Sequence, residues 1–241
     1  MPPRLFCHDL PNPRLPDQRC VLDPEQTRHA RKVLRLGVGS AVALLDGQGT
    51  CAQAQILGFD QGHALCQVTS RETADRPAPA ITIATCIPKG PRADDLIDQL
   101  SQLGVDQIIP LRADRSVVDP GRGKLEKFER RAQEASKQCG RLYLMTIREP
   151  LSFDAALHEQ ADVKLILSPA VDMAPHTTTN LRQRLSQAQH AIALIGPEGG
   201  FTDNELACAT TAGFERWALA GPILRIETAA LTAAALLRHP L

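Results

Sequence analysis

The sequence has little of what membrane and secreted proteins carry, because its apolar runs are short. Among the longest are residues 191–195 and the alanine-rich stretch 229–237, which Thr232 interrupts. A helix that spans a bilayer needs about 20 consecutive apolar residues. The first ten residues, MPPRLFCHDL, also lack the apolar core of a signal peptide. We therefore expect a cytoplasmic protein without membrane association.

Excess charge of one sign is missing too, since 27 Lys and Arg residues balance 27 Asp and Glu residues among 241. Hydrophobic residues make up 43% and charged residues 22%. This is ordinary globular composition, and it excludes disordered, collagen-like and polybasic-tail proteins. The length suits one large domain or two modest ones. A zero net charge does not exclude a nucleic-acid partner, because the distribution of charge decides binding.

Closely spaced cysteines are absent as well. The seven cysteines stand more than ten positions apart and form no CxxC motif. The sequence therefore gives no local support for a zinc or redox site, and we expect no metal. An odd number of scattered cysteines favours free or buried thiols in a reducing compartment.

The sequence divides into two parts near residue 75. The stretch 70–80, SRETADRPAPA, is polar and carries two prolines, so it is typical of a linker. Before it, one helix begins at Asp23, a good N-cap, and ends near Gly37. Short strand-like runs alternate with glycine-containing turns around this helix. These runs include 40–45, 50–57 and 63–69. We expect residues 1–75 to form a small β-barrel.

Strands and helices alternate after the linker. The strands that we predict cover 81–87, 107–111, 142–146, 163–167, 191–195 and 216–219. The helices that we predict cover 93–103, 124–139, 181–189, 202–212 and 227–237. Such alternation predicts an α/β domain over residues 76–241, with a mostly parallel sheet and helices on both faces.

A glycine-rich loop, residues 195–202 (IGPEGGFT), joins an apolar strand to a helix with a capping box of Thr202 and Glu205. An open parallel sheet binds ligands at this end of its strands, and glycines let the backbone approach a ligand. The spacing matches neither GxGxxG nor a Walker loop, so no dinucleotide or triphosphate is indicated. A tight turn without a ligand explains the glycines equally well.

A second loop of this kind, residues 219–229 (LAGPILRIETA), follows the last predicted strand. Arg225 and Glu227 are the charged residues of this otherwise apolar segment. Glu227 at a helix start could serve the helix dipole alone. Two such loops at strand ends nevertheless favour a shared pocket.

Basic residues gather on the first predicted helix. Four of them have the spacing of one helical face, and no acidic residue occurs between Glu25 and Asp46. They are Arg28, Arg31, Lys32 and Arg35. Phosphate binding explains this pattern well, although a solvated face is the plainer reading. Residues 122–141 form a second basic tract with a surplus of four positive charges, and we expect acids such as Asp94 and Asp98 to lie elsewhere.

Seven segments in order along the chain carry a resemblance to a known family. They are 29–36 (HARKVLRL, with Asp46 and Gly47 after it), 88–90 (PKG), 103–105 (LGV), 115–118 (RSVV), 134–141 (EASKQCGR), 195–201 and 224–229. In these segments the sequence resembles the ribosomal RNA small subunit methyltransferase E family. This family methylates N3 of a uridine in 16S rRNA with S-adenosylmethionine and belongs to the SPOUT superfamily. The resemblance covers almost the whole chain.

The resemblance implies a trefoil-knotted SPOUT domain after a PUA-like barrel that holds RNA. It also implies a homodimer, S-adenosylmethionine in the knot cleft, and 16S rRNA of the small ribosomal subunit as partner. The residues expected at the cofactor are Leu167, Ser168, Ile195, Gly196, Pro197, Gly199, Gly200, Leu219, Gly221, Leu224 and Thr228. Those expected at the RNA are Arg4, Arg28, Arg31, Lys32, Arg35, Lys89, Lys137, Gln138 and Arg141.

The chain departs from the family pattern at a few positions. Gln99 and Gln102 stand where the family commonly has Lys and Glu, and Pro222 stands where it has Arg. The absence of that arginine weakens the expected binding of substrate or cofactor. Arg225 and Glu227 are retained.

We expect an enzyme, an S-adenosylmethionine-dependent rRNA (uracil-N3)-methyltransferase. The N3 proton of uridine must be removed, because the neutral imide is a poor nucleophile. Arg225 is expected to stabilise negative charge on a uracil carbonyl oxygen. Glu198 or Glu227 is expected to accept the proton, unless it only caps a helix. The sulfonium of the cofactor supplies the chemical drive.

Two other classes of protein stay open. A non-catalytic RNA-binding or ribosome-assembly module with a degenerate methyltransferase fold would keep the basic helix and need no donor pocket. A small-molecule enzyme with a doubly wound sheet would explain the glycine loops but not the basic face.

Overall fold

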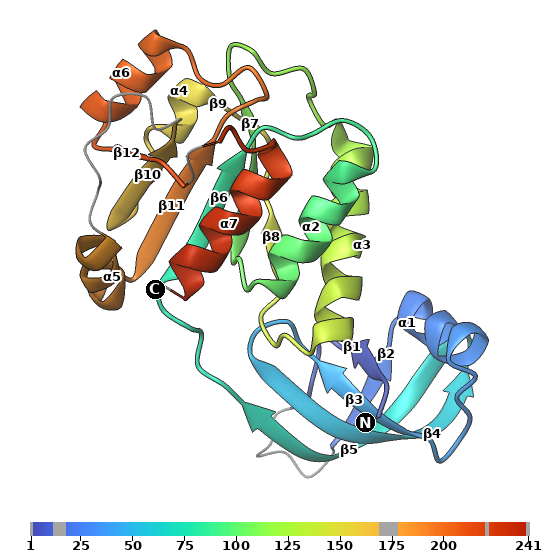
Figure 1. The fold of residues 1–241 in the computed structure, drawn as a ribbon. Helices are drawn as coiled ribbons and strands as arrows, with labels where there is room; N and C mark the ends of the chain where they lie inside the picture. The colour runs from blue at the N-terminus through green and yellow to red at the C-terminus, as the bar shows by residue number, and fades with distance from the viewer. Residues whose placement is uncertain (1, 12–17, 169–177, 220–221, 240–241) are drawn as a thin grey trace. The chain divides into compact units, whose positions relative to one another are not determined.

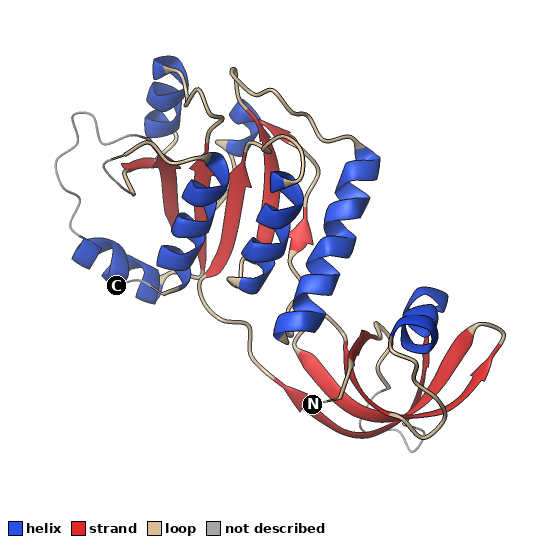
Figure 2. Cartoon of the chain, turned by 45° about the vertical axis from the view of Figure 1, so that its right-hand side comes forward, coloured by secondary structure: helices blue, strands red, loops and turns tan. Residues whose placement is uncertain are grey.

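The computed structural model describes residues 2–11, 18–168, 178–219 and 222–239. Its backbone contacts divide the chain into two units. Unit 1 contains Met1–Arg76 and Ser136–Leu144, and unit 2 contains Pro77–Ala135 and Met145–Leu241. Figures 1 and 2 show that each unit is built on its own sheet.

Unit 1 has a five-stranded sheet in the order β1-β3-β4-β5-β2. Its strands are β1 (Arg4–Phe6), β2 (Arg19–Leu22), β3 (Ala41–Leu45), β4 (Thr50–Asp60) and β5 (His63–Thr73). β1 is parallel to β3, and the other pairs are antiparallel. Alternate residues of β4 and β5, among them Ile56 and Cys66, face the core of this unit because successive side chains of a strand point to opposite faces.

The helix after β2 starts as predicted but does not continue as a regular α-helix. The carboxylate of Asp23 accepts a hydrogen bond from the N–H of Gln26 (2.7 Å) and so caps α1 (Pro24–Arg28). The chain then widens into a π-helix, η1 (His29–Val33). The prediction of one α-helix as far as Gly37 is therefore wrong.

Packing accounts for the wider turn. Ala30 is fully buried, and Leu34 and Leu36 are partly buried against the core of unit 1. The N–H of Leu36 bonds to the carbonyl of Ala30 (2.9 Å), while Arg35 takes a positive φ of 54°. A regular helix would not turn these three apolar residues toward one core, since positions i, i+4 and i+6 spread around an α-helix.

Unit 2 has a parallel sheet in the order β12-β10-β11-β6-β7-β8, with β9 also beside β7. Its strands are β6 (Ala80–Thr85), β7 (Gln107–Arg112), β8 (Thr146–Ile147), β9 (Leu151–Ser152), β10 (Val163–Leu167), β11 (His190–Ile195) and β12 (Glu215–Trp217). Ile83 and Leu194 on the central strands are fully buried. Burial on both faces is the reason these strands are almost continuously apolar.

Most helices of the chain belong to unit 2. They are α2 (Arg92–Gln102), α3 (Arg122–Cys139, whose last residues belong to unit 1), α4 (Phe153–Ala156), α5 (Thr178–Gln187), α6 (Asp203–Thr211) and α7 (Ile226–Arg238). α2 and α7 lie side by side on one face of the sheet, where α7 contacts β6 and β11 (Figure 1). Within the described residues no helix is long and apolar enough to cross a membrane.

Three short elements differ from the sequence prediction. The strand predicted at 142–146 forms only at β8, and β9 and α4 were not predicted. Strands of two residues and a helix of four residues are too short for hydrophobic periodicity to reveal.

Candidate functional site

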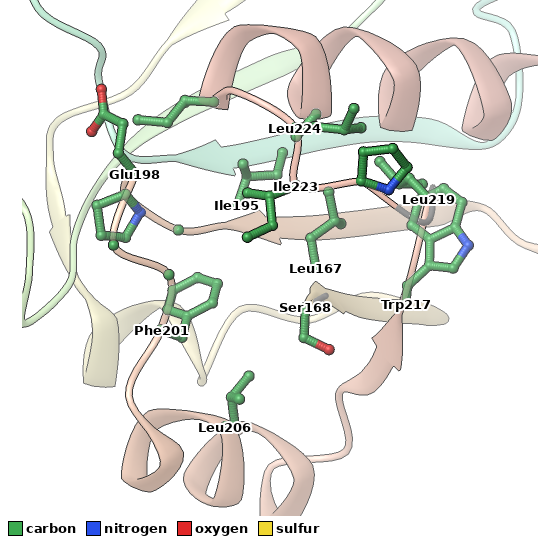
Figure 3. Close-up of a pocket in the computed structure, with 17 residues that line it drawn as sticks. Leu167, Ser168, Ile195, Glu198, Phe201, Leu206, Trp217, Leu219, Ile223 and Leu224 are labelled. Carbon is green, nitrogen blue, oxygen red and sulfur yellow. The ribbon is translucent and has the colours of Figure 1, made fainter. Parts of the chain in front are cut away.

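A pocket of about 290 Å³ opens in unit 2 beyond the carboxyl ends of the strands. The loops that follow β10, β11 and β12 and the start of α7 form its walls (Figure 3). The lining is mostly aliphatic and aromatic. Parallel sheets bind ligands at this edge, and small-molecule sites are mostly apolar with a few polar groups.

The first wall is the glycine loop between β11 and α6. The N–H of Cys86 bonds to the carbonyl of Ile195 (3.0 Å) and fixes the end of β11. Gly200 has a φ of +68°, which favours glycine. A Cβ atom at Gly196 would lie 3.1 Å from the ring of Phe201. The shape of the loop therefore favours glycine at both positions, whether or not a ligand is bound.

The same loop is anchored by contacts from the segment after β7. Thr202 and Glu205 form the predicted capping box of α6, which is confirmed. The second oxygen of the Glu205 carboxylate accepts a hydrogen bond from the N–H of Asp114 (2.9 Å). Nη1 of Arg115 donates to the carbonyl of Gly199 (2.6 Å). Sequence reasoning gave Asp114 and Arg115 no role, because these contacts join distant segments.

Nine of the eleven residues expected at the cofactor line this pocket. They are Leu167, Ser168, Ile195, Gly196, Pro197, Gly199, Gly200, Leu219 and Leu224. Thr228 is exposed on α7 and does not line the pocket. Gly221 lies outside the described residues. What these residues bind stays a prediction.

Seven further lining residues were not named individually among those expected at the cofactor. They are Phe201, Leu206, Trp217, Pro222, Ile223, Ile226 and Ala229. Most are apolar, and an apolar residue in a sequence is indistinguishable from an ordinary core residue. Phe201, Pro222, Ile223, Ile226 and Ala229 lie inside the two predicted loops, whose positions indicated them, whereas Leu206 and Trp217 lie outside both loops.

Of the three charged residues expected in catalysis, only Glu198 lines the pocket, whereas Arg225 and Glu227 are chain neighbours of the lining residues Leu224 and Ile226. The carboxylate of Glu198 points away from the apolar floor in Figure 3. Arg225 precedes α7 as its N-cap residue, and its exposed side chain has no polar partner among the described residues. Glu227 lies in the first turn of α7, with a side chain that is 20% exposed.

A residue without a predicted role stands between the two carboxylates. Nη1 of Arg92 lies 3.4 Å from Oε1 of Glu227, and Nη2 of Arg92 lies 3.6 Å from Oε1 of Glu198. Arg92 is the first residue of α2. One guanidinium therefore faces carboxylates from two different walls of the pocket.

Metal and thiol chemistry find no support at this site. No group of three or more His, Cys, Asp or Glu side chains in the described parts of the chain could hold a metal ion. All seven cysteines are free, as predicted. Cys86 lies beside the first wall, where burial raises the pKa of its thiol and Ser116 is its hydrogen-bond partner (3.2 Å). Such a thiol stays protonated and unreactive at neutral pH.

The basic residues of the first helix form an exposed surface on unit 1. All four side chains are exposed, although the π turn changes their predicted spacing. They are Arg28, Arg31, Lys32 and Arg35. The guanidinium of Arg31 stacks over the ring of Phe59 at 5.0 Å, which holds it in place. No ion pair in the described residues neutralises this surface, so it is available to phosphates.

The second basic tract is partly neutralised, which corrects the prediction that acidic residues lie elsewhere. Nζ of Lys127 on α3 lies 2.5 Å from a carboxylate oxygen of Asp94 on α2. Nε of Arg131 lies 3.5 Å from a carboxylate oxygen of Asp98. The charge surplus counted along 122–141 ignored these acids because they come from a neighbouring helix.

The remaining residues expected at the RNA differ in availability. Nη1 of Arg4 donates to the carbonyls of Lys137 (3.0 Å) and Gln138 (3.2 Å), so it caps the end of α3. Lys137 is only 7% exposed, and Arg141 is half-buried. Gln138 and, in unit 2, Lys89 are exposed. Arg4 and Lys137 thus contribute to packing within unit 1.

Two family models match different parts of this chain. The family model of an RNA methyltransferase PUA domain matches residues 22–69, and that of an RNA methyltransferase domain matches residues 75–238. A ribosomal RNA small subunit methyltransferase E from Synechocystis sp. is 33% identical over 217 residues, which is 89% of this chain and 71% of that protein.

Two solved structures share the fold over nearly their whole length. One is a methyltransferase from Legionella pneumophila in complex with the bound cofactor SAM, with a TM-score of 0.85, 29% identity and coverage of 99% of this chain and 97% of that one. The other is a ribosomal RNA small subunit methyltransferase E from Neisseria gonorrhoeae bound to S-adenosyl methionine, with a TM-score of 0.85, 27% identity and the same coverage. The predicted fold class, a SPOUT domain with a PUA-like N-terminal domain, is confirmed.

Proposed function

This chain belongs to the ribosomal RNA small subunit methyltransferase E family, and from that membership we propose that it methylates N3 of a uridine in 16S rRNA. The observation that carries the proposal is the pocket beyond the strand ends, which two glycine-containing loops enclose. Two relatives of the same fold are bound to S-adenosylmethionine. The pocket is the place in this chain where such a methyl donor would bind.

The residues present fit this cofactor. The apolar side chains of Ile195, Phe201, Leu219 and Leu224 offer surfaces for an adenine ring and a thioether chain. The glycine loop brings backbone N–H and carbonyl groups to the wall, which suits the polar edge of a purine. The volume of about 290 Å³ is near the lower end of small-molecule sites. When bound, S-adenosylmethionine supplies an electrophilic methyl group.

We assign the proton and charge handling to charged residues in the lining of the pocket or next to it in the chain. Arg225, exposed and without a polar partner in the described residues, stabilises negative charge on a uracil carbonyl oxygen. Glu227 or Glu198 accepts the N3 proton as N3 gains the methyl group, so the uridine leaves the reaction uncharged. The remaining contribution of the protein is to orient the two reactants and exclude water.

The two units divide the work in this proposal. Residues 1–75 act as a PUA-like RNA-binding domain, and residues 76–241 act as the methyltransferase domain. The exposed basic surface of Arg28, Arg31, Lys32 and Arg35 supports the first role. Lys89, Gln138 and Arg141 add contacts to the RNA. We propose that the protein is cytoplasmic and works as a homodimer. Light scattering after gel filtration tests the dimer directly.

The test of the function is tritium transfer from S-adenosylmethionine to small ribosomal subunits and to naked rRNA, followed by mapping of the modified nucleoside. We expect label in 3-methyluridine at one position of 16S rRNA. Binding of S-adenosylmethionine, measured by titration calorimetry, separates the enzyme from a non-catalytic RNA-binding module. Saturable binding without transfer to either RNA would refute the proposed reaction, and no binding would favour the module.

Arg225→Ala tests the role of the arginine. We expect the single-turnover rate of methyl transfer to fall about 100-fold, because the variant has no preorganised charge at the developing oxyanion. The Kd of S-adenosylmethionine should stay within about twofold, since Arg225 does not line the pocket. Arg216→Ala, which removes an exposed arginine of β12, is the matched control. An unchanged rate in Arg225→Ala at saturating cofactor would disprove this role.

A further inference from the structure

Arg92 bridges the two walls of the pocket, although nothing in the sequence pointed to it. Its two terminal nitrogens face different carboxylates, Oε1 of Glu227 at 3.4 Å and Oε1 of Glu198 at 3.6 Å. Glu198 belongs to the glycine loop after β11, and Glu227 belongs to the first turn of α7. Arg92 itself begins α2, whose flank lies against α7.

The position of Arg92 is fixed by its own element. α2 buries Leu96, Ile97 and Leu100 completely, so its first turn has little freedom to move. The side chain of Arg92 is 38% exposed, so most of its surface is covered by protein. A planar guanidinium with donors on two sides suits the role of holding two carboxylates at once.

The two carboxylates are not equivalent. The side chain of Glu198 is 49% exposed, and its carboxylate points away from the pocket floor in Figure 3. The side chain of Glu227 is only 20% exposed, and its Oε2 atom is buried without a hydrogen-bond partner in the described residues. Glu227 is not itself a lining residue, but it directly follows Ile226, which lines the pocket.

An unpaired buried carboxylate oxygen calls for a physical reason, because such an atom has given up its hydration without compensation. Arg92 occupies Oε1 of Glu227 and leaves Oε2 as the atom that can still accept a proton or a hydrogen bond. Because Arg92 already holds this acceptor in place, the protein needs little rearrangement when a donor such as an imide N–H approaches. Glu198, with both oxygens nearer to water, has no comparable oxygen.

We propose that Arg92 is a positioning residue that holds Glu227 by one oxygen, so that Oε2 of Glu227 is the acceptor of the N3 proton. Glu198 serves as the second anchor of Arg92 and not as the base. This inference rests on the proposed function, since it assigns roles within the same reaction. It also predicts that the two walls of the pocket loosen when Arg92 is removed.

The test is a double-mutant cycle on single-turnover methyl transfer at saturating S-adenosylmethionine. We expect Arg92→Ala to lower the rate about 10- to 100-fold, as displacement of a reacting group by about 1 Å does. Arg92→Lys should restore part of the rate, because one of the two contacts can be kept. In a Glu227→Gln background, Arg92→Ala should have almost no further effect, since residues that act as a unit are not additive. In a Glu198→Gln background, Arg92→Ala should still lower the rate by most of the factor seen in the wild type.

A readout independent of activity accompanies the cycle. Titration calorimetry should show the Kd of S-adenosylmethionine rising about three- to tenfold in Arg92→Ala, because the walls that Arg92 joins are less well fixed. Arg148→Ala is the matched control, since Arg148 pairs with Glu159 at similar exposure (35% and 20%) outside the pocket. It should lower the Tm and leave both the rate and this Kd unchanged.

The outcomes separate the inference from the proposed function. If the wild-type protein binds S-adenosylmethionine but modifies no RNA, the proposed function fails, whatever Arg92 does. Suppose that the wild type is active and that Arg92→Ala lowers the rate of the Glu227→Gln variant by the same factor as it lowers the wild-type rate. Arg92 then does not act through Glu227, and the inference is wrong. A defect of Arg92→Ala that appears only in the Kd of the RNA would also overturn it, since Arg92 would then be an RNA contact.

Discussion

Asp106 shows how one buried residue joins distant parts of unit 2. Its Oδ2 atom accepts hydrogen bonds from the N–H of Ile81 and from Nη2 of Arg238, both at 2.9 Å. Arg238 also donates to the carbonyl of Gly104 (2.6 Å). Only 2% of the Asp106 side chain and 11% of the Arg238 side chain are exposed. The pair therefore fastens the end of α7 to the starts of β6 and β7.

We expect Asp106→Ala to lower the free energy of unfolding by about 3 kcal/mol or more, because it leaves the mostly buried charge of Arg238 without its ion-pair partner. Urea unfolding of the full chain, followed by circular dichroism, measures the change. Arg184→Ala, which removes a largely exposed pair with Glu215, should cost at most about 1 kcal/mol. Equal losses of stability in the two variants would contradict the structural importance of the buried pair. Adding Arg238→Met to Asp106→Ala should recover stability.

At the scale of elements, a hydrogen-bonded carboxylate joins the starts of two neighbouring strands of unit 2. Asp162, just before β10, accepts bonds from the N–H groups of His190 (3.0 Å) and Gln189 (2.8 Å) at the start of β11. These backbone bonds, first that of His190 and then that of Gln189, hold the pKa of Asp162 below its usual value. The carboxylate therefore joins two adjacent strands more strongly when it is ionised than when it is protonated.

The sign of the pH effect follows from this lowered pKa. The stabilisation by Asp162 is fully present above the ordinary aspartate pKa of about 4 and is lost as the pH falls through the lowered value. Asp162→Asn should therefore be less stable than the wild type at pH 6, and the difference should shrink below about pH 4. Urea midpoints measured from pH 6 to pH 3 provide the test. A difference that stays constant over this range would show that Asp162 does not contribute through its charge.

At the scale of the whole molecule, the proposed RNA surface and the proposed cofactor pocket belong to different units of the chain. The exposed basic residues Arg31 and Arg35 lie in unit 1, whereas the pocket lies entirely in unit 2. The other basic tract, on α3, has much of its charge neutralised by acids such as Asp94. Binding of RNA and binding of the methyl donor should therefore respond to different substitutions.

We expect Arg31→Ala with Arg35→Ala to weaken binding of a 16S rRNA fragment and to flatten its dependence on salt. The slope of log K against log salt should fall by about 2, roughly one for each phosphate that the variant no longer neutralises. The Kd of S-adenosylmethionine should not change. Lys127→Ala is the control, because the partner of Lys127 is Asp94. A slope that both variants leave unchanged would rule out the basic helix as the phosphate-binding surface.

Several elements could be predicted because their causes are local. Asp23 and Pro24 define the start of α1, and Thr202 with Glu205 defines the start of α6, through hydrogen bonds within four residues. The buried strands β6 and β11 are almost continuously apolar in the sequence. The glycine loop could be found because it directly follows such a strand. Hydrogen bonds and periodicity over so short a range depend on neighbouring residues, so they can be predicted from the sequence.

The sequence by itself therefore determined the alternation of elements, the two loops that line the pocket, the basic residues of the first helix and, by resemblance, the family. Only the tertiary structure decided that Lys127 meets Asp94, that Lys137 is buried, and that Arg92 stands between two carboxylates. Arg92 and Glu227 are 135 positions apart, and no local pattern links them. The contact of Arg92 with Glu227 exists because α2 and α7 pack on the same face of one sheet, which depends on how the strands are ordered.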